Sequence, residues 1–112
     1  MNTLINTSDL CTQTDVFCSL LDQSLFYEAH EALEALWFEH RFEKCDEIRL
    51  VRAYINAAVS FELIKRGRPK AALKPWGFFQ KHFELIQKVP QVHQVFYELI
   101  YKKIFETSKK IS

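Results

Sequence analysis

Apolar residues recur through this chain at intervals of three and four, the spacing that places side chains on one face of an α-helix. The clearest stripe lies in residues 91–108 and consists of Phe96, Tyr97, Ile100, Tyr101 and Ile104. No segment alternates apolar and polar residues convincingly with the period of two that a half-buried strand requires. Only two glycines occur in 112 residues, so a β-sandwich or barrel with many tight turns is not favoured. The sequence therefore predicts an all-α fold.

The length and the interruptions of this pattern predict one helical bundle of about five helices in a single domain. Residues 1–13 are polar and show no sustained period, so we expect a flexible N-terminal arm there. Thr14 can cap the first helix, which makes 14–112 the bundle domain.

The helix expected over about 47–66 carries apolar residues on several faces, so it should be the central, most buried helix. Gly67 is suited to end it, because glycine readily takes the left-handed conformation that follows a helix. Pro75 and Gly77 should kink the next helix or split it in two.

Charge is divided unevenly along the chain, although the net charge is only +1. Residues 1–47 hold ten acidic and two basic side chains, a net charge of −8. Residues 48–112 hold thirteen basic and four acidic ones, a net charge of +9. Acidic and basic helices that pack side by side account for this division, and we favour that interpretation. A basic face for nucleic acid or an acidic partner is the alternative.

The cysteines and the N-terminus predict a cytoplasmic protein with reduced thiols. The three cysteines are odd in number and form no Cys-x-x-Cys pair, so neither a disulfide framework nor a zinc knuckle is expected. The first residues lack the basic segment and apolar stretch of a signal peptide. No run of about 18 apolar residues is present to span a membrane.

One face of the helix expected over about 24–41 combines aromatic and titratable side chains. Tyr27, His30, Glu34 and Trp37 follow one another at spacings of three, four and three. Because this face carries the large aromatic side chains, we expect it to point inward, with an imidazole and a carboxylate in or beside the core. Buried polar groups of this kind need partners.

The third helix offers such partners. Arg52 would satisfy Glu34 by pairing with it across two helices, and Asn56 lies one turn further on. A solvated edge that holds Arg52 and Glu62 is about as well supported. The binding residues that this helix pair predicts are Tyr27, His30, Glu31, Glu34, Trp37, Arg52 and Asn56.

A divalent metal site is a second interpretation. His30-Glu31-x-x-Glu34 invites comparison with the H-E-x-x-H zinc motif, in which the glutamate is the base. His30, Glu34 and Glu62 would be the ligands of a metal-dependent hydrolase, and Glu31 would be its catalytic base. Because two ligands from one helix do not make a site, we favour a structural His–Glu pair.

Nucleic-acid binding is a third interpretation and the least favoured. Residues 65–81 contain six basic side chains and no acidic one, interleaved with aromatic residues. Such a run can follow a phosphate backbone and stack bases. More often it is the solvated rim of a helical hairpin whose aromatic side chains lie in the core.

Residues 26–37, F-Y-E-A-H-E-A-L-E-A-L-W, precede an alanine-rich helix that ends in K-R-G-R-P, and this order resembles the domain-of-unknown-function family 309. The resemblance covers roughly residues 15–90. It implies a small helical bundle from bacteria or archaea with no established activity. The shared site that it implies consists of His30, Glu31, Glu34 and Trp37.

Such proteins tend to carry Gln early in the third helix and His near its end, where Arg52 and Glu62 stand here. This departure favours an adjustable ion-pair network over a common metal or proton-transfer role. We therefore expect a non-enzymatic module whose cluster of His30, Glu34 and Arg52 binds another protein or a small ligand. A homo-oligomer is one form that such a partner could take.

Overall fold

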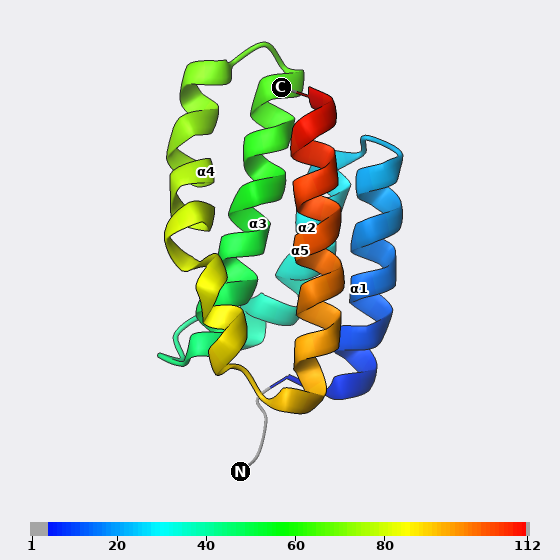
Figure 1. Cartoon of the computed structure of the whole chain (residues 1–112), viewed down its shortest axis with the longest axis vertical. Coiled ribbons are helices and arrows are strands. Elements are labelled where there is room, and N and C mark those ends of the chain that lie inside the picture. Colours follow the sequence, from blue (N-terminus) through cyan, green and yellow to red (C-terminus); the bar gives the residue numbers. More distant parts are fainter. Residues whose placement is uncertain (1–4, 112) are drawn as a thin grey trace.

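The computed structural model describes residues 5–111. Among these residues there is no strand, and no helix is long and apolar enough to cross a membrane. The expected all-α bundle of about five helices is confirmed (Figure 1). Its elements in chain order are α1 (Thr7–Asp22), α2 (Phe26–Trp37), the 3-10 helix η1 (Phe38–His40), α3 (Asp46–Lys65), α4 (Pro69–His82), the 3-10 helix η2 (Phe83–Lys88) and α5 (Gln91–Ile111).

Helix α3 is the centre of the bundle, as its composition predicts. It packs against α2, α4, α5 and η2 (Figure 1). Its alanines let neighbouring helices approach closely, and its larger side chains fill the space between them. The fully buried side chains on α3 are Leu50, Val51, Ala53, Tyr54, Ala57 and Ala58, with Phe61 1% exposed.

The first helix begins earlier than the sequence indicated. Asn6 caps it, because the Asn6 side-chain oxygen accepts a hydrogen bond from the backbone N–H of Asp9 at 3.0 Å. The helix start expected at Thr14 is therefore seven residues too late, and residues 1–4 lie outside the described part of the chain. The apolar stripe extends into the segment expected to be an arm, since the buried residues of α1 are Leu10, Thr14, Phe17 and Leu21.

Helix α4 continues through Pro75 instead of splitting there. A proline in a helix removes one backbone donor, but packing along α3, with Ala72 and Phe79 buried, holds the flanking turns in place. The change to 3-10 geometry comes later, at Phe83. Gly67 has a φ of +77°, so it ends α3 in the left-handed conformation, as expected.

Candidate functional site

The face of α2 that the sequence predicted to be buried lies at the edge of the buried surface, with Tyr27 exposed and His30, Glu34 and Trp37 partly buried. Tyr27 is 49% exposed, and the side chain of Glu34 is 46% exposed. Burying a wholly apolar stripe avoids the desolvation of titratable groups, which explains why α2 is turned in this way. The expected inward orientation is therefore corrected. The residues that α2 buries are Phe26, Ala29, Leu33 and Leu36.

His30 and Glu34 form a pair within α2. Nε2 of His30 lies 3.5 Å from a carboxylate oxygen of Glu34, and Nδ1 contacts the backbone carbonyl of Tyr27. A ring nitrogen beside a carbonyl oxygen must donate, which assigns a proton to Nδ1. The centre of the Tyr27 ring lies 4.8 Å from that of the imidazole and covers its edge.

Arg52 does not join this pair. Its guanidinium carbon lies 4.8 Å from the centre of the Phe78 ring on α4, and no ion pair joins it to Glu34 in the described residues. The Asn56 side-chain amide donates to the backbone carbonyl of Arg52 at 2.9 Å. Of the two arrangements that the sequence left open for Arg52, the structure has the solvated one.

The residues suggested as metal ligands are not brought together. Glu62 pairs with Arg66, the residue that follows α3, at 2.5 Å. Across residues 5–111, no three His, Cys, Asp or Glu side chains are grouped so that they could hold a metal ion. Glu31, the suggested base, is exposed on α2.

Arg52 and Asn56 instead line a groove of about 470 Å³ between α3 and α4. The other charged residues that line it are Lys74 and Lys81, and no acidic side chain among the described residues does so. Because Arg52 lies over the ring of Phe78, that ring holds the guanidinium in place while its N–H groups can still donate. The remaining wall is mainly apolar and consists of Val59, Leu63, Pro75, Gly77 and Phe78.

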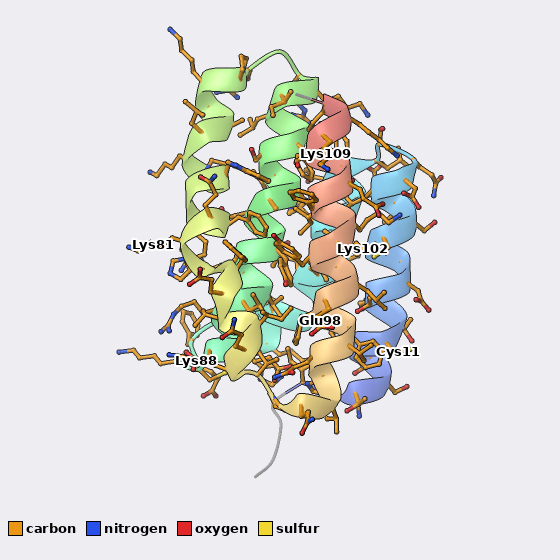
Figure 2. All side chains as sticks on the ribbon, viewed as in Figure 1. Cys11, Lys81, Lys88, Glu98, Lys102 and Lys109 are labelled. Carbon is orange, nitrogen blue, oxygen red and sulfur yellow. The ribbon has the colours of Figure 1, made fainter. Side chains whose placement is uncertain are left out.

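Two neighbouring hollows extend this positively charged surface. Arg49, Arg52 and Lys81 each line two of the three hollows, so the surface is continuous. Figure 2 shows Lys81 and Lys88 extending outward from the side of the bundle formed by α4 and η2. The acidic residues that line the two neighbouring hollows are Glu43 and Glu84, and the other residues with a positive charge are Arg41, Lys44 and Lys88.

The basic run that ends at Lys81 does not form one surface. The Lys65 ammonium, at the end of α3, donates a hydrogen bond to the backbone carbonyl of Ser24 at 2.8 Å, so it is already engaged within the protein. The ring of Trp76 packs against two core aromatic rings and is not presented for base stacking. From this run, Lys74 and Lys81 contribute to the groove.

A buried polar network that was not identified from the sequence joins α1, α3 and α5. One carboxylate oxygen of Glu47 accepts hydrogen bonds from His93 Nδ1 and from the Tyr97 hydroxyl, each at 2.6 Å. Nε2 of His93 lies 2.9 Å from the Thr7 hydroxyl. His93 and Tyr97 are fully buried and four residues apart in the apolar stripe of α5, which is a detectable signal. Their partner Glu47 is 46 residues from His93, and no local spacing identifies it.

The two buried tyrosines predict a loss of stability at high pH. Burial raises the pKa of Tyr97 above its ordinary value of 10, and the Glu47 carboxylate raises it further. Burial likewise raises the pKa of Tyr54. Because both values are raised in the folded state, this contribution is complete below pH 10 and is lost as the pH rises above it.

We expect the free energy of unfolding to fall by up to about 1.4 kcal/mol per pH unit for each of these tyrosines above pH 10. Urea unfolding at a series of pH values measures this slope, and Tyr54→Phe should reduce it. Ultraviolet absorbance that shows all four tyrosines ionised while the helices remain intact would contradict the prediction.

Comparison with protein-family models gives a match. A family model described as a domain of unknown function (DUF309) matches residues 15–74, which is more than half of the chain. The matched segment contains all of α2 and α3, and therefore Arg52 and Asn56 of the groove. A search of curated proteins and a search of solved structures each found no match.

Proposed function

The chain belongs to the DUF309 family, and we propose that it is a non-enzymatic ligand-binding module whose site is the groove around Arg52. The ligand that this groove favours is an anion with a phosphate group attached to an apolar part. The observation that carries the proposal is that Arg52, Lys74 and Lys81 line one groove from two helices, and that no acidic side chain of residues 5–111 lines it with them.

The groove has the donors that a phosphate group requires. A guanidinium presents a planar fork of N–H groups to two oxygens of a phosphate, whereas the lysine ammonium groups act as point charges. Three exposed cations close to one another repel, so an oxyanion between them relieves that repulsion. The Phe78 ring and the neighbouring aliphatic side chains can hold the apolar part of the ligand.

The α2 motif contributes to this site through Trp37, which lines the neighbouring hollow together with Arg52. His30 and Glu34 lie outside the groove linings and pair with each other. The proposal also places the protein in the cytoplasm, and its three free cysteines are consistent with reduced thiols.

Calorimetric titration with inorganic pyrophosphate tests the proposal. We expect saturable binding that weakens as salt is raised from low ionic strength to about 0.15 M. Arg52→Gln and Lys81→Gln should each weaken binding by at least about fivefold, because each removes a charge-assisted contact.

Lys110→Gln is the matched control, since it removes one charge from an exposed lysine of α5 outside the groove. It should change the affinity by less than about twofold. The proposal fails if wild-type protein shows no saturable binding. It also fails if Arg52→Gln and Lys110→Gln weaken binding equally, because the effect would then be one of overall charge.

A further inference from the structure

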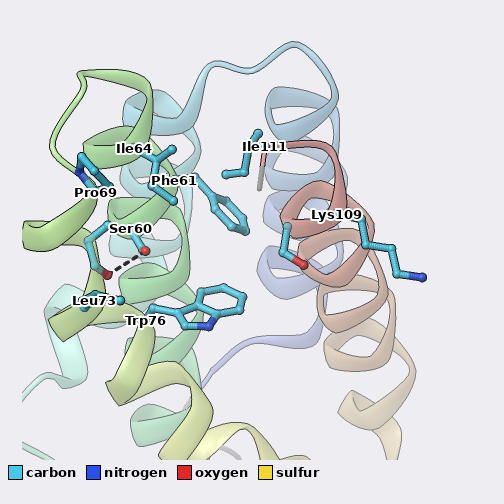
Figure 3. A pocket seen from close by; sticks show the side chains of 10 residues that line it. Ser60, Phe61, Ile64, Pro69, Leu73, Trp76, Lys109 and Ile111 are labelled. Atoms are coloured by element: carbon cyan, nitrogen blue, oxygen red, sulfur yellow. Dashed lines mark hydrogen bonds between the residues drawn. The ribbon is translucent and has the colours of Figure 1, made fainter.

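A separate hollow lies between the α3–α4 hairpin and the C-terminal turn of α5 (Figure 3). Its volume is about 380 Å³, and it shares no lining residue with the groove around Arg52. Phe61 and Trp76 form an aromatic wall, with ring centres 5.6 Å apart. Aliphatic side chains complete the apolar lining, and those that matter here are Ile64, Leu73 and Ile111.

The two hydroxyl groups in the lining are already used as donors. Ser60 donates to the backbone carbonyl of Ala72 at 2.8 Å, shown as the dashed line in Figure 3. Ser108 donates to the carbonyl of Phe105 at 2.7 Å. The walls of the pocket therefore favour hydrocarbon over a polar group that needs a donor.

Basic side chains are found among the residues that line the pocket and those that flank its lining in the sequence. Among the described residues that line it, Lys109 alone is charged, and its ammonium lies 4.5 Å from the centre of the Phe105 ring, directed away from the apolar wall (Figure 3). Arg68 and Lys70 are exposed and flank the lining residue Pro69 at the start of α4. An acidic group at the mouth would therefore be attracted, and a cationic one repelled.

We propose that this pocket binds an amphipathic carboxylate of the medium-chain fatty acid class. The hydrocarbon chain lies against Trp76 and Phe61, and the carboxylate stays at the mouth near the cationic side chains. The volume falls within the range of about 300–1,000 Å³ that is typical of small-molecule sites. Leu73, which is 69% exposed at the rim, is covered when the chain is bound.

Titration of the full-length protein with decanoate, followed by tryptophan fluorescence, tests this proposal because Trp76 lines the pocket. Decanol and decyltrimethylammonium have the same chain with a neutral and a cationic head group. All three are used below their micelle-forming concentrations. We expect decanoate to bind at least about tenfold more tightly than the cationic compound, with decanol between them.

Substitutions at Leu73 separate the effect of charge from that of apolar contact. Leu73→Glu should weaken decanoate binding at least about fivefold relative to Leu73→Gln and should strengthen binding of the cationic compound. Leu99→Glu is the control, since Leu99 is exposed on α5 and does not line the pocket. Circular dichroism checks that each variant is folded.

Three results would overturn the proposal. These are no saturable binding of decanoate, equal affinity for the three head groups, and equal weakening by Leu73→Glu and Leu99→Glu. Pyrophosphate binding at the Arg52 groove should be unaffected by Leu73→Gln, which adds no charge beside Lys74. The two sites can therefore fail independently.

Discussion

Replacing Glu47 with alanine is expected to lower the free energy of unfolding by about 3–5 kcal/mol. Glu47 is 5% exposed, and one of its oxygens accepts hydrogen bonds from both His93 and Tyr97. The substitution leaves an imidazole N–H and a phenol hydroxyl buried without this acceptor, and each unsatisfied group is costly. Urea unfolding followed by circular dichroism measures the change.

Glu84→Ala is the matched control, because Glu84 is exposed in η2. It should change stability by less than about 0.5 kcal/mol. Glu47→Gln should fall between the two variants, since its amide oxygen can still accept while its amide N–H₂ group cannot. A loss below about 1 kcal/mol for Glu47→Ala would contradict the view that this network ties α1 and α5 to α3.

Replacing Tyr54 with alanine should also lower the free energy of unfolding by about 3–5 kcal/mol, because it leaves a cavity in the core beside the middle of α3. Tyr54 is fully buried, and its ring centre lies 6.0 Å from that of Phe79 and 6.1 Å from that of Tyr97. Its hydroxyl donates to the backbone carbonyl of Tyr97 at 3.0 Å. Thermal and urea unfolding give the size of the loss.

Two other variants show where this loss comes from. Tyr54→Phe keeps the ring and removes the hydrogen bond, so about 1 kcal/mol should be lost. Tyr27→Ala removes the same side chain from an exposed position of α2 and should cost less than about 0.5 kcal/mol. Similar losses for Tyr54→Ala and Tyr27→Ala would show that α3 is not the centre of the core.

The helices could be predicted where a single local signal dominates. Helix α3 carries apolar residues on several sides, and only the central position in the bundle buries all of them. Gly67, with its positive φ, marks the end of this helix. The start of α1 could not be predicted in the same way, because a short polar segment conceals the cap at Asn6 and the buried Leu10. The rotation of α2 was mispredicted because Tyr27 was treated as a core residue, although its ring lies half exposed beside His30.

The residues that line the groove were identified from the sequence, but not as members of one site. Arg52 and Asn56 were identified on the third helix, and Lys74 and Lys81 were assigned to a separate hypothesis about nucleic acid. The packing of α4 along α3 brings them together, and this contact depends on side chains distributed over both helices. Local spacing contains no information on such a contact, and the same holds for Glu47 and His93.

The most direct test of the binding proposal is a nuclear magnetic resonance titration with pyrophosphate, which reports where the anion binds. We predict that the shifts with the largest changes are those of the Arg52 guanidinium Nε–H, the Asn56 side-chain amide and the backbone amides from Lys74 to Lys81 except Pro75. Signals from α1 should remain unchanged. Shifts of similar size for the exposed lysines of α5, or no change at Arg52, would contradict the account.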